Sequence, residues 1–459
     1  MAPYPATPSD TASSGAPAPT RRSNATLAAF AASCLPYAAL GLPVYVTLPE
    51  FYASQIGVPL AVVGLVFMLV RIGDIVLDPL FGAIIDRTRT RFGRYRVWML
   101  ASAPVLMISV AMLFFVERGA GPAHLIVWLV IMYLGYSASL LSQMSWASVL
   151  SSDYDQRSRI YGWWQAANIV GVLAVLLIPP VVQALGQDYL SAVRLQGAFI
   201  VVLLPLALFI TVRFTPEPQA PADATRREGL TAWLSLLRSR ALQRLLTSDL
   251  MLGAARGTVA ALFFYFFEHA KGFERAETSI LLLVYFVAGL VGAPVWAWAA
   301  MKWGKHQTLA VASVYFALTL LIASLLTPQG ALVIAAIAIF ATGLAFGAAD
   351  LLLRAMMADV SDEVLLDTGT DRTGLLFSVL TATSKLGYAI SVGTFIALQQ
   401  IGFDAGVGAV NTPEVIGWLT GIFVGVPLVL LLISAVVLKG YPLDQARHAK
   451  IRTELDARR

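Results

Sequence analysis

The sequence predicts an all-α integral membrane protein with twelve transmembrane helices, and three observations lead to this fold class. Of the 459 residues, 58% are hydrophobic and only 13% are charged, whereas a soluble domain carries about 25% charged residues. The mean hydropathy is +0.74. Apolar segments of about 20 residues, the length that spans a bilayer, recur through the chain. A soluble enzyme and a disordered chain are therefore excluded.

The first half of the chain predicts a disordered cytoplasmic tail followed by six spanning helices. Residues 1–24 are rich in Pro, Ala, Ser and Thr, so they bury too little apolar surface to fold. The apolar run that follows is too long for the core of a secretion signal, and we interpret it as the first helix. The N-terminal bundle is expected over residues 25–215. Its spans are expected at 27–53, 60–85, 97–116, 123–150, 160–185 and 195–214.

The second half repeats this arrangement after a polar interval. Residues 216–242 predict a central cytoplasmic linker, residues 243–440 a C-terminal six-helix bundle, and residues 441–459 a polar, basic cytoplasmic tail. The spans are expected at 243–268, 278–301, 308–326, 331–357, 373–400 and 414–438. Two bundles that rock about a site between them are the architecture that this pattern favours.

The distribution of positive charge predicts the orientation in the membrane. Most of the 32 Lys and Arg residues fall in the tails and loops that are inside when both termini are inside. This predicts a multi-pass protein of the plasma membrane with both termini in the cytoplasm, and it explains the net charge of +5 without nucleic acid. One cysteine and four histidines predict no disulfide and no structural metal. We expect a monomer in the lipid bilayer, with no cofactor beyond a coupling ion.

Ionised side chains within the second expected helix predict a cation site. Arg71, Asp74 and Asp78 lie on one helical face, within about 60° of one another. A charge at the bilayer centre costs about 2.5–3.5 kcal/mol, so this face must point into the protein. Two carboxylates one turn apart repel each other, and a proton or a small cation between them relieves the repulsion. The alternative is a static ion pair with Arg71 that only holds helices together.

A lysine in the eleventh expected helix is the natural counter-charge. Lys385 has Thr381 and Tyr388 on the same helical face. A lysine that competes with a cation for the carboxylates couples ion binding to the arrangement of the two halves. The alternative is a structural salt bridge.

Polar side chains beside aromatic rings in the fourth and fifth helices suit a neutral, polyhydroxylated ligand. The residues are Ser139, Ser142, Gln143, Trp146, Gln165 and Asn168. Ordinary interhelical hydrogen bonds, worth about 0.6 kcal/mol each, explain them equally well.

Further charges lie in the seventh and tenth helices, where Asp249 and Arg256 form one set and Asp350 and Arg354 the other. Asp350 and Arg354 are four residues apart and can neutralise each other. Asp350 is the better candidate for ligand contact because it lies deeper than the acids of the following loop.

Charged loops predict gates that stabilise one conformation. The loop after the second helix mixes an acid at a helix end with a basic run, and two corresponding loops in the halves mix acids with arginines. The candidate gating residues are Asp86, Arg87, Arg94, Asp155, Arg159, Asp359 and Arg372.

Three stretches resemble one family. RIGDIVLDPLFGAIIDRTRTRFGRYRVW resembles the second-helix signature of the glycoside–pentoside–hexuronide:cation symporters, the melibiose-permease branch of the major facilitator superfamily. SWASVLSSDYDQRSR resembles the end of the fourth helix of that family, and ADVSDEVLLDTGTDRTGLLFSVLTATSKLGYAI resembles its eleventh. The resemblance covers about residues 27–440 and implies two six-helix bundles and symport with sodium, lithium or a proton by alternating access.

The resemblance also implies roles for individual residues. Asp74 and Asp78 match the acids of the cation site of the family, and Lys385 matches its eleventh-helix lysine. Ser139 falls where a hydroxyl assists the cation in the melibiose permease, and Trp146 matches the tryptophan beside the sugar.

Two departures from the family pattern limit what the resemblance implies. Leu77 stands where the melibiose permease has Asn, and Na⁺ needs several oxygen ligands, whereas two carboxylates alone can share a proton. We therefore favour proton coupling over sodium. Ser142 stands where that permease has an aspartate that contacts galactoside hydroxyls, so galactoside specificity is not supported. Carriers of lysophospholipids and other amphiphiles are wider relatives, and such a solute is the alternative to a sugar.

A different class, the intramembrane prenyltransferases, also uses Asp-rich motifs in apolar helices. Such an enzyme needs a second acidic motif that faces the first, but the candidates Asp359, Asp362 and Glu363 fall in an expected loop. The chain also lacks the glycine- and lysine-containing loop that cradles phosphates. A secondary active transporter of a sugar or glycoside, not an enzyme, is the function that the sequence favours.

Overall fold

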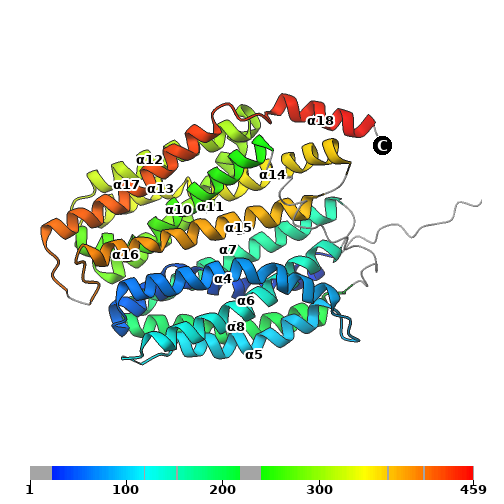
Figure 1. Cartoon of the computed structure of the whole chain (residues 1–459). Helices are drawn as coiled ribbons and strands as arrows, with labels where there is room; N and C mark the ends of the chain where they lie inside the picture. Colours follow the sequence, from blue (N-terminus) through cyan, green and yellow to red (C-terminus); the bar gives the residue numbers. More distant parts are fainter. Residues whose placement is uncertain are drawn as a thin grey trace, which may run out of the picture.

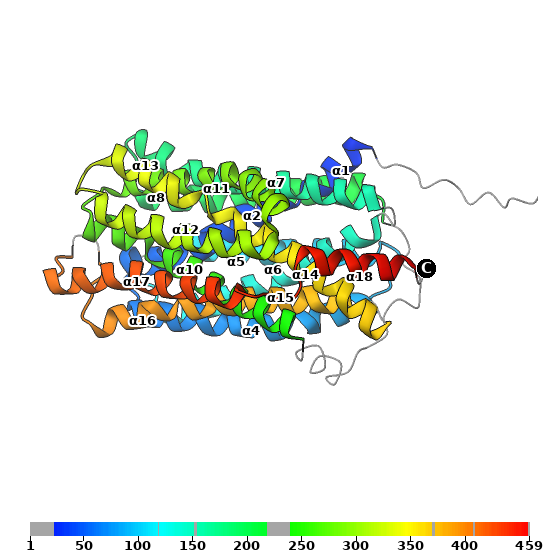
Figure 2. The same cartoon turned by 90° about the horizontal axis from the view of Figure 1, so that it is seen from above.

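The computed structural model describes residues 23–117, 119–150, 154–217, 239–369, 372–406 and 409–457. Within these ranges the chain is helical and has no β-strand. Twelve helical segments are long and apolar enough to cross a membrane, which confirms the predicted fold class. The helices lie roughly side by side along one direction (Figure 1). Figure 2 shows α1 and α18 at the same end of the molecule, which we call the terminal end.

Six spans come from the first half of the chain. Its elements are α1 (Asn24–Ala31), α2 (Cys34–Tyr45), α3 (Thr47–Phe51), the π-helix η1 (Tyr52–Ile56), α4 (Leu60–Arg87), α5 (Tyr95–Phe114), α6 (Pro122–Leu150), α7 (Tyr154–Ala184) and α8 (Tyr189–Phe214). The single helix predicted at 27–53 is therefore several helices. Its first break follows Ala31, where the backbone N–H of Ser33 donates to Thr211 Oγ1 of α8 at 3.2 Å instead of continuing the helix.

The other six spans come from the second half. Its elements are α10 (Arg240–Tyr265), the π-helix η2 (Phe266–Ala270), α11 (Arg275–Trp303), α12 (Lys305–Leu326), α13 (Leu332–Gly343), α14 (Phe346–Thr368), α15 (Thr373–Ser391), α16 (Gly393–Gln400), α17 (Pro413–Leu438) and α18 (Gln445–Ala457). Two differences from the sequence prediction matter for the site. The tenth span continues to Thr368, so the acids expected in a loop lie on a helix. Much of the expected tail is a helix that packs against α14.

The two halves meet along two seams. α4 packs against α15 and α16, and α7 packs against α11. Figure 1 shows α4 and α15 side by side between the other helices of the two halves. Large apolar side chains remain exposed elsewhere, for example Val76 and Leu325 at 71% and 72%, as expected for surfaces that face lipid.

Close approach of helices depends on small residues at particular positions. A Cβ at Gly292 of α11 would lie 2.0 Å from the carbonyl oxygen of Leu344, between α13 and α14. Only glycine permits this approach, which is typical of helix packing in membranes.

The first apolar segment of each half ends in a π-helix. Both η1 and η2 are π-helices, and each precedes a glycine with positive φ, Gly57 at 88° or Gly272 at 68°. This repetition is the structural form of an internal repeat. Single π-turns are frequent at functional sites.

At the same end of the molecule Asp188 caps α8, and hydrogen bonds from Ser191 lower the pKa of the Asp188 carboxyl.

Candidate functional site

The two acids of α4 meet the lysine of α15 at the seam between the halves. Lys385 Nζ lies 2.7 Å from Asp74 Oδ2 and also forms an ion pair with Asp78 Oδ2. The Ser137 hydroxyl of α6 donates to Asp74 Oδ1. The second oxygen of Asp78, Oδ1, is buried and has no hydrogen-bond partner among the residues that the structure describes. One helical turn separates the two acids, so a single ammonium group reaches both.

Two carboxylates against one ammonium leave one negative charge in excess. The side chains of Asp74, Asp78 and Lys385 are only 5%, 20% and 23% exposed, so water screens this charge weakly. A proton or a small cation that binds the carboxylates neutralises the excess and competes with Lys385. The site can therefore exchange an inter-half ion pair for a bound cation.

Arg71 lies one turn from Asp74 but forms an ion pair with neither acid of α4. Its guanidinium lies 3.8 Å from the centre of the Tyr45 ring of α2, and it forms no salt bridge with a carboxylate among the described residues. The alternative of a static ion pair between Arg71 and the α4 acids is therefore wrong. Lys385 takes both carboxylates instead.

Aromatic rings and a second arginine converge next to Arg71. Tyr388 of α15 lies 5.3 Å from the Tyr45 ring, 6.0 Å from the Arg71 guanidinium and 5.8 Å from that of Arg256. Arg256 of α10 pairs with Asp350 of α14 at 3.1 Å. The sequence had suggested neutralisation of Asp350 by Arg354, and the structure corrects this to Arg256. The Asp350 side chain is 58% exposed, so it remains accessible for hydrogen bonding.

The α6 hydroxyl that contacts Asp74 is that of Ser137, not that of Ser139, which was predicted to bind the cation. Ser139 forms a hydrogen bond with the Tyr37 hydroxyl of α2, whereas Ser137 contacts Asp74. Residues two apart on a helix point in nearly opposite directions, because each residue turns the helix by about 100°. The choice between these neighbours depends on the rotation of α6, which a single sequence does not report.

Three further α6 residues predicted to bind substrate lie inside the N-terminal half. Ser142 donates to the carbonyl of Ala138 at 2.7 Å. Gln143 donates to Ser33 Oγ at 2.6 Å, and Trp146 Nε1 donates to the Pro216 carbonyl at 3.1 Å. Ser142, Gln143 and Trp146 are all 0% exposed. Gln143 and Trp146 bond to other segments, as the hydrogen-bonding alternative describes, whereas Ser142 bonds within α6. None of the three makes the contacts of the central site.

Three other predicted substrate residues make none of the contacts of the central site. Gln165 is exposed and Asn168 half-buried on α7. Thr381 is exposed on α15 and donates to the carbonyl of Phe377. Their predicted roles remain untested.

Three loops were predicted to form gates. Glu217, which the sequence analysis missed, accepts hydrogen bonds from the backbone N–H groups of Arg94 and Tyr95 at 2.5 and 2.9 Å and so caps α5. The Arg159 guanidinium donates to Asn24 Oδ1 at 2.5 Å. Both contacts lie within the N-terminal half. Of the remaining gating residues, the side chains of Asp86 and Asp155 lie outside the described ones, Arg87 is exposed, and Arg372 immediately precedes α15.

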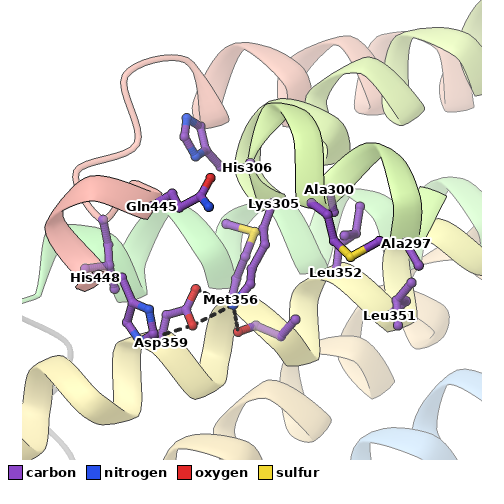
Figure 3. A pocket seen from close by; sticks show the side chains of 14 residues that line it. Ala297, Ala300, Lys305, His306, Leu351, Leu352, Met356, Asp359, Gln445 and His448 are labelled. Carbon is purple, nitrogen blue, oxygen red and sulfur yellow. Dashed lines mark hydrogen bonds and ion pairs between the residues drawn. The ribbon is translucent and has the colours of Figure 1, made fainter. Parts of the chain in front are cut away.

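Asp359 belongs to a separate cluster in the C-terminal half. Lys305 Nζ lies 2.6 Å from Asp359 Oδ1, and the His448 ring of α18 lies 2.9 Å from Asp362 Oδ2. Figure 3 shows Lys305, Asp359 and His448 beside a cavity of about 390 Å³ that residues of α11, α12, α14 and α18 line. The cluster fastens α18 to its own half and is remote from the α4 acids.

A second cluster joins the halves at the end opposite the termini, and the sequence analysis missed it. Arg275 of α11 lies 2.7 Å from Glu50 of α3 and 2.8 Å from Glu268 of η2. Tyr189 of α8 donates to Glu50 at 3.1 Å, and the Arg275 guanidinium lies 4.5 Å from the Tyr189 ring. We call these four residues the opposite-end cluster. Glu50, an acid at the end of the first apolar segment, is the feature of the sequence that could have indicated this cluster.

A comparison with known families decides the class of this helical protein. The model described as "MFS/sugar transport protein" matches residues 29–445, nearly the whole of both halves. The chain belongs to the MFS/sugar transport protein family. This confirms the resemblance to the cation symporters, and it makes the chain a multi-pass membrane transporter rather than an intramembrane enzyme.

Curated relatives of this MFS transporter carry different solutes. It is 25% identical to the inner membrane symporter YicJ of Escherichia coli, with 85% of each chain covered. It is 24% identical to the glucuronide carrier protein homolog of Escherichia coli, covering 89% of this chain and 90% of the relative. It is 21% identical to the sodium-dependent lysophosphatidylcholine symporter 1 of Xenopus tropicalis, with 89% and 83% covered.

Among solved structures, the transporter resembles a mutant of the nucleoside transporter NupG. The TM-score is 0.68 at 12% sequence identity, over 90% of this chain and 100% of the other. At this identity the likeness shows the fold alone, which is that of the major facilitator superfamily.

Proposed function

We propose that this transporter couples uptake of a sugar or glycoside to a cation, a proton in preference to sodium, by alternating access. One observation carries the proposal: Lys385 of the second half is paired with both Asp74 and Asp78 of the first. The cation that enters the acid pair must displace the lysine or share its partners. Ion binding then changes a contact that joins the halves, which is the requirement for coupling.

The ligands around the acids favour a proton. Besides the two carboxylates, the described hydrogen-bonding neighbours are the Ser137 hydroxyl and the Lys385 ammonium. A sodium ion prefers several oxygen ligands, and Leu77 supplies none where an amide would. A proton needs only a carboxylate oxygen, and Asp78 Oδ1 is buried without a partner.

The central side chains support a polar solute with rings. Tyr45 and Tyr388 offer aromatic faces 5.3 Å apart, and the accessible carboxylate of Asp350 accepts hydrogen bonds from hydroxyl groups. The symporter and glucuronide-carrier relatives agree with a sugar or glycoside. The relative that carries lysophosphatidylcholine supports the second candidate, a lysophospholipid or other amphiphile on the same fold.

Several expectations complete this proposal. The units that move are the bundles of residues 25–215 and 243–440, joined by the linker 216–242. The transporter acts as a monomer in the plasma membrane with both termini in the cytoplasm. The positive-inside distribution of Lys and Arg supports this orientation.

Asp78→Asn tests the cation site. The variant removes the excess charge, so gradient-driven accumulation of the solute in proteoliposomes should disappear while the protein stays folded. Uptake is measured with an inward proton gradient, an inward sodium gradient and neither. Asp367→Asn, an exposed acid on α14, is the matched control and should accumulate solute normally. Full accumulation by Asp78→Asn would remove the acid pair from the coupling mechanism.

A further inference from the structure

Arg71 is a buried cation that forms no ion pair with an acid in the described part of the chain. It is 4% exposed, and its Nε has no hydrogen-bond partner among the described residues. The neighbouring groups are the Tyr45 ring at 3.8 Å and the Tyr133 hydroxyl, neither of which carries a charge. The nearest acid along the chain, Asp74, is already occupied by Lys385 and a serine.

Such an arrangement is costly unless something else completes it. Buried charges are normally paired because their desolvation is unfavourable. A cation–π contact offsets only part of that desolvation. A guanidinium that stays charged in a protein and presents donors in a planar fork is the group best suited to a bidentate oxyanion.

The second arginine of the site provides an internal comparison. Arg256 is equally buried at 3% exposed, but Asp350 neutralises it at 3.1 Å. Both guanidinium groups lie about equally far from the Tyr388 ring, at 6.0 and 5.8 Å. Among the described residues, Arg256 therefore has a carboxylate within ion-pair distance, whereas Arg71 stacks on a neutral ring.

We propose that Arg71 binds an oxyanion of the transported substrate, a carboxylate or a phosphate, while Tyr45 and Tyr388 pack against the adjoining part. This inference rests on the proposed function for its transport role and goes beyond it by requiring an acidic substrate. The anion comes from one of two sources, a sugar acid or the head group of an amphiphile.

The position of Arg71 gives the bound anion a second effect. Arg71 and Asp74 are three residues apart on α4, so a substrate anion at Arg71 lies close to the acid pair. Its negative charge favours protonation or cation binding at Asp74 and Asp78. By linkage, cation binding favours the anionic substrate equally. Binding of the substrate and binding of the cation thus favour each other through electrostatic attraction alone.

Binding to the purified protein at constant pH and salt tests the inference without any ion gradient. Two matched pairs are compared: 4-nitrophenyl β-D-glucuronide with the glucoside, and lysophosphatidic acid with monoacylglycerol. We expect wild type to bind the charged member of one pair at least tenfold more tightly, and the pair identifies the source of the anion. Arg71→Gln should abolish that preference and leave the Kd of the neutral member within twofold. Arg71→Lys should retain part of it.

The matched control is Arg213→Gln. Arg213 is exposed at the end of α8, and its guanidinium lies against the adjacent Phe214 ring. This variant should bind like wild type. The inference is overturned if wild type prefers the charged member of neither pair. It is also overturned if Arg71→Gln keeps the preference, or weakens both members equally. A proton-coupled carrier that prefers neutral sugars would retain the proposed function and refute this inference alone.

Discussion

Replacement of Arg275 by Gln should open the end of the protein opposite the termini. The opposite-end cluster holds the two halves together there, since Arg275 of the second half lies 2.7 Å from Glu50 of the first. The same guanidinium also lies 2.8 Å from Glu268. Without it, two acids remain near each other with no cation between them.

The expected effect follows from burial. The Glu50 side chain is 1% exposed, and those of Glu268 and Arg275 are 17% and 18% exposed. Removing one partner of a buried pair costs about 3–5 kcal/mol. Because two members of the cluster are partly accessible, we take the lower figure of about 3 kcal/mol, roughly a hundredfold in the equilibrium between closed and open states.

Thiol labelling measures this opening. The only cysteine, Cys34, is 1% exposed and is replaced by Ser to give a cysteine-free parent. Ala53 of η1 is 7% exposed, so a cysteine placed there reacts slowly with a membrane-impermeant maleimide while the end stays closed. In the Arg275→Gln variant the rate should rise at least tenfold. The increase in labelling rate is larger when the parent protein spends less time in the open state.

A nearby lysine supplies the control. Lys271 Nζ donates to the carbonyl groups of Ser324 and Thr327 at 2.6 and 2.8 Å, all within the second half. Lys271→Gln removes a positive charge from the same end without removing a contact between halves, so labelling should stay at the parent rate. Equal labelling in Arg275→Gln and the parent, with both proteins folded, would refute the reasoning.

Three further predictions concern the other seams and buried positions. Lys385→Ala leaves two unpaired carboxylates and should either abolish transport or raise exchange relative to net uptake in a proteoliposome assay; unchanged kinetics would make the lysine structural. Trp146→Phe loses the hydrogen bond to Pro216, so apparent stability should fall by about 1 kcal/mol with no change in substrate Kd; a large rise in Kd would return Trp146 to the binding site. Gly292→Ala places a Cβ 2.0 Å from the Leu344 carbonyl and should lower the melting temperature, whereas Gly421→Ala, with open space around its Cβ, should not.

The sequence predicted that Lys385 meets the two acids of α4, because charges in apolar helices are rare and costly. Asp74, Asp78 and Lys385 were recognisable as a group from their helical spacing and opposite charge. The structure brings them together across the α4 and α15 seam. Their role in coupling remains a proposal.

Helical spacing predicted less about which neighbours each polar side chain meets. Ser137 and Ser139 both lie on α6, but only Ser137 contacts Asp74. The polar residues near Trp146 in the sequence are typical of a ligand-binding site, but the structure encloses Trp146 within the N-terminal half. The rotation of a helix about its axis depends on packing against all its neighbours, and one sequence does not contain that information locally.

The ion pair between Glu50 and Arg275 was also not predicted from the sequence. Glu50 and Arg275 are 225 residues apart, and each had the ordinary position of a charge at the end of a span. Arg71 lies close to Asp74 in sequence but stacks on Tyr45, whereas Lys385 contacts both acids. The sequence by itself determined twelve apolar spans and the acids and lysine placed in them, since bilayer insertion acts on each segment separately. Only the tertiary structure decided which charges pair and which arginine remains without an acid, because that outcome depends on competition among side chains from both halves.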